Sequence, residues 1–108
     1  WATNFSYIID LGDIYDIDQV IMMPMIFHDY PHIVRDYSID LTFWTSIENP
    51  KLENMKQYQI IGWHPGGMKP EVFYSFSAPK TRGRYVIVYR ENVWRVVSFC
   101  HIEIIIIP

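Results

Sequence analysis

The chain has 108 residues, of which half are hydrophobic and 19% are charged. This length is enough for one domain with a core of its own, and such a composition excludes an intrinsically disordered chain. The formal net charge is −3 and the nine basic residues are scattered, which argues against the clustered cationic surface that nucleic-acid binding requires.

Hydrophobic residues recur with a period of two, which is typical of half-buried strands, and no comparable segment has a helical period. In chain order the predicted strands are 5–11, 15–23, 36–44, 58–62, 72–76, 84–90 and 95–107. A turn at Gly12-Asp13 is expected to separate the first two strands, and Pro79 to end the fifth. Glu91-Asn92 is expected to join the last two as a hairpin. No apolar run approaches the roughly 20 residues that a transmembrane helix needs.

The clearest alternation lies in segment 36–44, where apolar and polar residues take turns. The predicted buried face is Tyr37, Ile39, Leu41 and Phe43, and the predicted exposed face is Asp36, Ser38, Asp40 and Thr42. Short strands separated by Gly, Pro and Asn predict a single all-β domain over 1–108, a sandwich or a barrel. Two long connections, 26–33 and 49–56, are where a binding function is expected.

Several motifs occur in an order that is similar to a known family. They are Trp1, Ile9-Asp10-Leu11-Gly12, Tyr15-Asp16-Ile17, Arg35 before a strand, Arg84 to Tyr89, and Ser98 to Ile104. Together they resemble coagulation-factor type C (discoidin) domains of the galactose-binding-like kind, and the last strand resembles the fucose-binding F-type lectins. The resemblance implies an antiparallel jelly-roll β-sandwich whose loops bind a ligand at one end. The family has a strand before its first Trp, so the domain is expected to be incomplete at its N-terminus.

Cys100 is the single cysteine of the chain. In F-type lectins the cysteine of the last strand pairs with a cysteine in the segment before the first Trp. The resemblance therefore implies a disulfide between Cys100 and a partner outside this chain. The alternative is a buried free cysteine that acts as a small hydrophobic residue, and the sequence leaves both interpretations open.

The candidate ligand-binding residues are His28, Arg35, Trp63 and His64. His28 and Arg35 bracket the first long connection and supply hydrogen-bond donors for a sugar. Arg35 lies where the resemblance implies a sugar-binding Arg, whereas His28 replaces another Arg and departs from the fucose-specific pattern. The alternative for Arg35 is an ion pair with Asp36 at a strand edge.

Trp63 and His64 precede the turn residues Pro65-Gly66-Gly67. An exposed Trp beside such a loop is a stacking surface for a sugar or a protein partner. The alternative is that Trp63 plugs the end of the sandwich. Trp94, in the predicted last hairpin, has the same two interpretations.

No metal site, cofactor or catalytic residue is predicted. His28 and His32 are four residues apart, but Pro31 lies between them in a non-helical segment. The resemblance implies a calcium-binding Glu after the last cysteine, where this chain has His101, a poor ligand for a hard cation. The four acidic residues Asp10, Asp13, Asp16 and Asp18 are interpreted as a solvated hairpin end. No pair of opposed carboxylates and no nucleophile motif is present, which argues against an enzyme.

These observations predict a non-catalytic module that binds glycans or glycoproteins at the cell surface or outside the cell, with a role in adhesion. The sequon Asn4-Phe5-Ser6 favours that compartment slightly. The alternative is an intracellular docking subunit of a large assembly, favoured by the apolar runs 21–27 and 104–107. The run 104–107 could equally be a central strand buried on both faces. A sheet edge left open by a missing strand predicts poor solubility of the chain alone.

Overall fold

The computed structural model describes residues 3–24, 32, 34, 38–93 and 97–108. These residues form five strands and one short 3₁₀ helix. The elements are β1 (Thr3–Pro24), β2 (Thr42–Ser46), η1 (Leu52–Gln57), β3 (Gln59–Trp63), β4 (Tyr74–Val93) and β5 (Phe99–Ile107). Within the described ranges, no helix has the length and apolar character that a membrane crossing requires.

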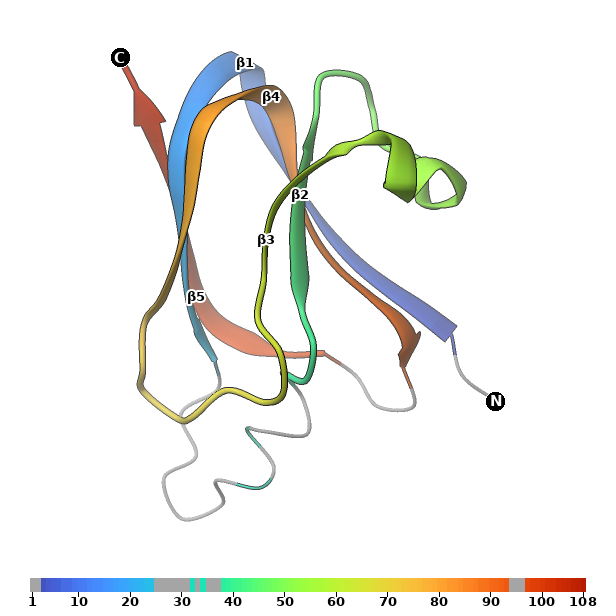
Figure 1. The fold of residues 1–108 in the computed structure, drawn as a ribbon, viewed down its shortest axis with the longest axis vertical. Helices are drawn as coiled ribbons and strands as arrows, with labels where there is room; N and C mark the ends of the chain where they lie inside the picture. The colour runs from blue at the N-terminus through green and yellow to red at the C-terminus, as the bar shows by residue number, and fades with distance from the viewer. Residues whose placement is uncertain (1–2, 25–31, 33, 35–37, 94–96) are drawn as a thin grey trace.

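The strands form one antiparallel sheet in the order β3-β2-β4-β1-β5, and the sheet folds back on itself. The long strands β1 and β4 pair along most of their length and bend together, as Figure 1 shows. Along β4, only residues 85–89 pair with β2. Along β1, only residues 16–24 pair with β5. The two halves of the sheet therefore face each other as a β-sandwich, which confirms the predicted all-β, antiparallel class.

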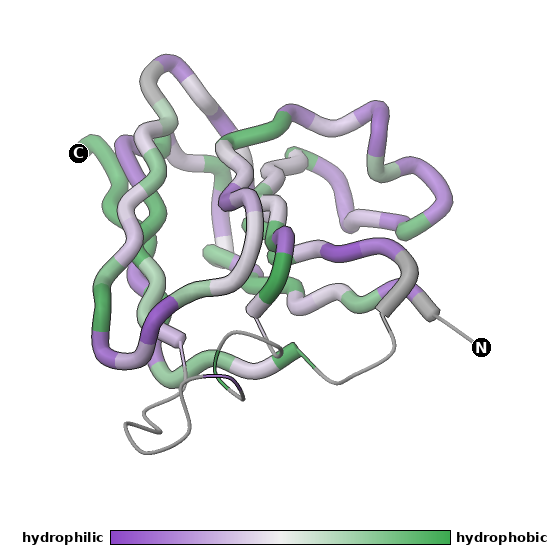
Figure 2. The backbone as a smooth tube through the Cα atoms, turned by 60° about the horizontal axis from the view of Figure 1, so that its bottom comes forward, coloured by the Kyte–Doolittle hydropathy of each residue, from purple (hydrophilic) through white to green (hydrophobic). Residues whose placement is uncertain are grey.

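The core lies between these two layers and draws on every strand. Figure 2 shows hydrophobic and hydrophilic residues mixed along each strand, in keeping with one buried and one solvated face. The fully buried centre is made by Ile17, Val20, Met22, Leu41, Phe43, Val86 and Val88. Phe43 and Phe76 stack across the sandwich with ring centroids 4.3 Å apart. Burial of each such side chain contributes roughly 1.5–3 kcal/mol, so this cluster is the main source of stability.

The expected turn at Gly12-Asp13 is wrong, because β1 continues through these residues. The pairing of β1 with β4 shifts register between Asp10 and Tyr15, and Gly12 has a φ of 87°. These features mark a β-bulge, which bends a strand without reversing it. The expected end of a strand at Pro79 is also wrong, because β4 runs from Tyr74 to Val93. The turn-forming residues therefore bend the sheet between its two layers.

The expected hairpin of the last two strands is wrong as well, since β1 lies between β4 and β5. β5 is an edge strand of the described sheet, so the isoleucine run is not a central strand. Ile104 lies opposite the buried Val20 and packs on the core. Ile105 and Ile107 are 37% and 47% exposed. The β-branched residues of segment 104–107 correctly predicted that it belongs to a strand. Which strand it pairs with depends on the rest of the chain.

In segment 36–44 the strand β2 starts only at Thr42, and residues 38–41 precede it. The predictions for Asp36 and Tyr37 lie outside the described residues. Leu41 and Phe43 are buried as predicted. Ser38 is buried although it was assigned to the exposed face, because its hydroxyl donates to the carbonyl of Val34 (2.6 Å) and accepts from the Met68 amide (3.0 Å). These hydrogen bonds offset the cost of burying the hydroxyl.

The connection 49–56 includes most of η1, which covers part of the outer face of the sheet. Met55 of η1 is 3% exposed and packs on Ile87 and Tyr89 of β4, with Trp44 and Tyr58 around it. This second, smaller cluster lies on the opposite side of the sheet from the core. It creates a rigid hydrophobic base on a face that would otherwise meet only solvent.

Candidate functional site

Six strand ends lie at the same end of the sandwich, which we call the loop end (Figure 1). They are Pro24, Thr42, Trp63, Tyr74, Val93 and Phe99. The strand pairs Thr42–Trp63, Met22–Tyr74 and Pro24–Phe99 include five of these ends, and Val93 is the end of β4 from which the chain leads to β5. The connections β1–β2, β3–β4 and β4–β5 therefore start and finish at the loop end. Of the two connections where the sequence predicted a binding function, 49–56 instead joins β2 to β3 at the opposite end.

The loop between β3 and β4 is fixed to the residues that precede β2. Asp40 and Gly66 exchange two hydrogen bonds, one from the Asp40 amide to the Gly66 carbonyl (2.9 Å) and one from the Gly66 amide to the Asp40 carboxylate (2.6 Å). The His64 amide donates to the carbonyl of Leu41 (3.0 Å). Gly66 has a φ of 75°, which a glycine adopts without strain. The loop is thus held rigidly beside the start of β2.

Trp63 is the last residue of β3 and its side chain is 57% exposed. Its cross-strand partner is Thr42, whose other partner is Tyr89 of β4. Directly opposed residues in antiparallel strands project to the same face, so Trp63 lies on the outer face of the sheet. The interpretation of Trp63 as a plug of the sandwich end is wrong, and its indole is available to a ligand.

His64 lies half-buried at the start of the loop, with its ring edge-on to Tyr74 at a centroid distance of 4.6 Å. Its Nδ1 atom is buried and has no hydrogen-bond partner in the described part of the chain. The contact with Tyr74 holds the imidazole against the sheet. His64 therefore helps to hold the start of the loop, next to Trp63 in the chain, against β4.

The other two predicted ligand-binding residues, His28 and Arg35, lie outside the described residues, as does Trp94. Cys100 is a free, exposed cysteine of β5. The interpretation of Cys100 as a buried hydrophobic residue is therefore wrong. Its disulfide with a cysteine outside this chain stays a prediction.

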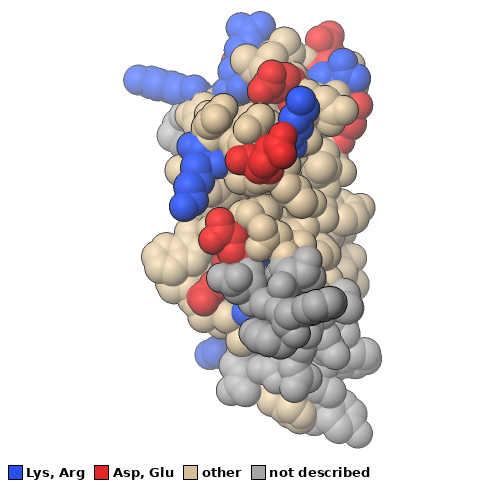
Figure 3. Space-filling model, turned by 90° about the vertical axis from the view of Figure 1, so that its right-hand side faces the viewer, with Lys and Arg blue, Asp and Glu red and all other residues tan. Residues whose placement is uncertain are grey.

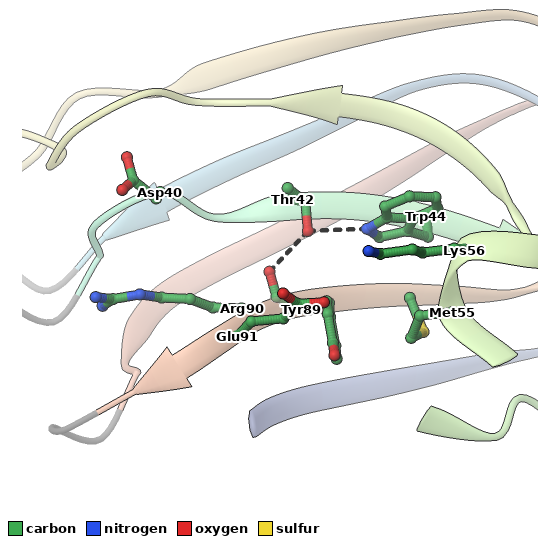
Figure 4. Close-up of a pocket in the computed structure, with 8 residues that line it drawn as sticks. All are labelled: Asp40, Thr42, Trp44, Met55, Lys56, Tyr89, Arg90 and Glu91. Carbon is green, nitrogen blue, oxygen red and sulfur yellow. Dashed lines mark hydrogen bonds between the residues drawn. The ribbon is translucent and has the colours of Figure 1, made fainter. Parts of the chain in front are cut away.

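A pocket of about 480 Å³ opens on the outer face of the sheet near the loop end (Figure 4). It lies between β2, β4 and η1, and is lined by Asp40, Thr42, Trp44, Met55, Lys56, Tyr89, Arg90 and Glu91. Sequence reasoning missed this pocket, because the connection 49–56 gave no sign that Met55 would fold back onto the sheet. The only available signal was the position of Trp44, which alternates with the buried Phe43.

Trp44 is held in a fixed orientation by a short chain of hydrogen bonds (Figure 4). Its indole Nε1 donates to Thr42 Oγ1 (2.8 Å), and Thr42 Oγ1 donates to the carbonyl of Tyr89 (2.8 Å). The indole is half-buried and forms a wall of the pocket. A fixed aromatic ring needs no further ordering when a ligand stacks on it.

The rim of the pocket carries two acidic and two basic side chains, from Asp40, Glu91, Lys56 and Arg90. Acidic and basic groups are also interspersed over the face drawn in Figure 3. Burial, followed by the nearby carboxylate of Glu91, raises the pKa of Tyr89. The pocket therefore combines donors and acceptors with little net charge.

No group of three or more His, Cys, Asp or Glu side chains in the described part of the chain could hold a metal ion. The acidic cluster lies along β1, and its residues Asp10, Asp13, Asp16 and Asp18 are all exposed. The expected hairpin end is thus a bulge, and Asp10 is paired with Arg84 at 2.8 Å. None of these four carboxylates lines the pocket between β2, β4 and η1.

No protein-family model and no curated protein matches this chain. Five chains of solved structures resemble it, and three of them are described below. The C-terminal domain of a chitobiase from Bacteroides fragilis is 14% identical, with a TM-score of 0.69 over 96% of this chain and 64% of that one. The module CpGH89CBM32-5 from Clostridium perfringens, in complex with GalNAc-β-1,3-galactose, is 12% identical, with a TM-score of 0.69 over 96% and 67%. A fragment named for a chitobiase from Bacteroides thetaiotaomicron is 14% identical, with a TM-score of 0.68 over 98% and 62%.

At such low identity these likenesses show the fold. The chain spans about two thirds of the length of each of these structures. The discoidin and F-type features of the sequence stay predictions. The predicted fold class, a jelly-roll antiparallel β-sandwich of the galactose-binding-like kind, is confirmed.

Proposed function

We propose that this chain is a non-catalytic recognition module that binds the carbohydrate of a glycoconjugate at its loop end. Trp63 is the stacking platform, and His28, Arg35 and His64 belong to the same site. The observation that carries the proposal is the 57% exposure of Trp63. Trp63 lies beside a loop that is hydrogen-bonded to Asp40 and Leu41, just before β2 starts. A large aromatic ring, exposed on a rigid element, offers a sugar face an apolar contact that is already ordered.

The structural neighbours support a sugar as the ligand class. One of them is a complex with GalNAc-β-1,3-galactose, and two carry the name of chitobiase. Arg35 and His28 supply the charged hydrogen-bond donors that fix sugar hydroxyls, while the ring of Trp63 contacts the apolar face. Single sites of this kind bind weakly, and several copies strengthen binding.

The wider setting belongs to the same proposal. We place the module outside the cell or at its surface, in an adhesion role, as a discoidin-like domain. Asn4 of the sequon is exposed, so it is accessible to a glycosyltransferase. A disulfide from the exposed Cys100 to an upstream cysteine fits an oxidising compartment.

A glycan array probed with the full-length protein tests the proposal. The wild type is expected to bind a defined set of glycans, and Trp63→Ala and Arg35→Ala each to weaken binding at least about tenfold, or 1.4 kcal/mol. Ile47→Ala is the matched control, because Ile47 is 56% exposed and lies after β2, away from the loop end. Folded wild-type protein that binds no glycan, or variants that bind as the wild type does, would contradict the proposal.

The alternative function is an intracellular docking subunit, and the exposed isoleucines of β5 favour it. Ile105 and Ile107 lie on an edge strand of the described sheet, where a partner strand can add. If this function is right, the folded protein will bind no glycan on the array. It also predicts a purified complex whose partner is released by Ile105→Lys and retained by Ile47→Lys.

A further inference from the structure

We propose that the pocket between β2, β4 and η1 is a second sugar subsite, continuous with Trp63, which accepts the next unit of a neutral glycan. The inference rests on the proposed function and adds to it the length and charge of the ligand. The sequence predicted a binding function for the connection 49–56, which contains most of η1, but it assigned no role to Trp44.

The position of the pocket follows from the register of the sheet. Thr42 lines the pocket and is the cross-strand partner of Trp63, so the two candidate subsites share a border. Trp44 lies two residues further along β2, which is about 7 Å at the rise of a strand, and β3 lies about 5 Å to the side. Trp63 and Trp44 are therefore diagonal neighbours on one face. Their spacing suits consecutive rings of a chain laid across β3 and β2.

The wall and the base of the pocket are already ordered. The hydrogen bonds from Trp44 to Thr42 and from Thr42 to the Tyr89 carbonyl, each 2.8 Å long, fix the indole. Met55 and Tyr89, 3% and 5% exposed, form a packed base beneath it. The pocket nevertheless stays open, at about 480 Å³, within the size range of small-ligand sites. The protein thus keeps a space beside a fixed aromatic ring that its own side chains do not fill.

The rim determines the charge of the ligand. Lys56 and Arg90 are donors, and Asp40 and Glu91 are acceptors, so their charges balance (Figure 4). A sugar hydroxyl both donates and accepts, and it can use groups of both signs at once. A strongly anionic sugar would gain no net attraction from this rim, because the two carboxylates offset the two cations. The rim therefore matches a neutral glycan better than a sialylated or sulfated one.

The experiment measures the affinity of the full-length protein for neutral glycans of one to four units that end in galactose or N-acetylgalactosamine. In the wild type, extension beyond the first unit is expected to raise affinity about tenfold. Trp44→Ala is expected to abolish this gain, and Arg90→Ala to reduce it several-fold. Arg82→Ala is the matched control and keeps the gain, because Arg82 is an exposed arginine of β4 outside this pocket.

Each outcome bears on a different statement. If the wild type is folded and binds no glycan, the proposed function and this subsite both fail. If it binds but shows no gain with length, or if the gain survives Trp44→Ala and Arg90→Ala, the subsite alone fails. A larger gain for a sialylated tetrasaccharide would overturn the assignment to neutral glycans. Because Trp44 is half-buried, near-ultraviolet circular dichroism is used to check that Trp44→Ala is folded. If Trp44→Ala does not fold, the result for Arg90→Ala decides the test.

Discussion

Asp10 illustrates how a single side chain ties the two long strands together at their bend. Its carboxylate accepts from Arg84 Nε (2.8 Å) and Nη2 (3.1 Å), and from the amide of Gly12 (2.8 Å) within the bulge. The hydrogen bond from Arg84, and then that from Gly12, holds the pKa of Asp10 below its ordinary value of 3.8. The same contact raises the pKa of Arg84, whose guanidinium also lies 5.3 Å from the ring centroid of Tyr85.

We expect Asp10→Asn to lower the Tm by a few degrees at most at neutral pH, since the pair is exposed and screened by salt. A carboxylate whose pKa is depressed by folding stabilises the protein above its unfolded pKa, and this contribution is lost as the pH falls through the folded pKa. The difference in Tm between wild type and variant should therefore be full at pH 7 and disappear as the pH falls below 3.8. Thermal unfolding followed across this range measures it. A difference that persists in strong acid would show that Asp10 acts through the bulge geometry alone.

At the scale of elements, β5 is the segment that most exposes the protein to unwanted association. It is an edge strand of the described sheet, and its outer positions Ile105 and Ile107 carry no charge. Natural edge strands avoid pairing with other molecules by placing Lys, Pro or a bulge at such positions. β5 has Glu103, but its last four strand residues are all isoleucine.

We therefore expect the 108-residue chain to aggregate when expressed alone, and Ile105→Lys to raise its soluble fraction several-fold. The charged side chain would oppose the approach of another strand, and Ile105 projects away from the core. Ile47→Lys is the control, because it adds the same charge at an exposed residue outside the strands. Soluble yield and sedimentation at several concentrations measure the effect. A wild-type chain that stays monomeric and soluble would contradict this explanation.

At the scale of the whole molecule, the end of β5 lies far from the candidate site. Ile107 pairs with Asp16 next to the bulge, whereas Trp63 and Thr42 lie at the loop end (Figure 1). A tether at the C-terminal side of the chain therefore leaves the outer face and the loop end free. Copies joined in this way can face the same glycan-coated surface together.

This geometry predicts strong avidity. A tetramer assembled through a C-terminal tag on the full-length protein should bind a dense glycan surface at least about 100-fold more tightly than the monomer. The physical reason is that the second and later contacts of a tethered tetramer are intramolecular. Surface plasmon resonance at two glycan densities measures it, with a tetramer of Trp63→Ala as control. Equal apparent affinities of monomer and tetramer would place the binding surface elsewhere.

Local pattern alone was sufficient for the all-β class and for part of the core. Alternation with a period of two is set by the geometry of a single strand, so it correctly placed Leu41 and Phe43 inside the sandwich. The Gly-rich loop after Trp63 was likewise recognisable from residue types that favour turns. These features involve neighbours in the chain, and their physics is present in a short segment.

Only the tertiary structure decided how the strands pair and which polar residues are buried. Whether Gly12 forms a turn or a bulge depends on β4, which continues to pair with β1 on both sides of it. Ser38 is buried because Met68, thirty residues away, donates to it. The pocket beside Trp44 exists because η1 folds back over β4, and no periodicity encodes that contact. The sequence thus determined the all-β class and core residues such as Leu41 and Phe43. Strand limits, pairing, edge position and the candidate subsites arise from contacts between distant segments, whose free energies no local pattern contains.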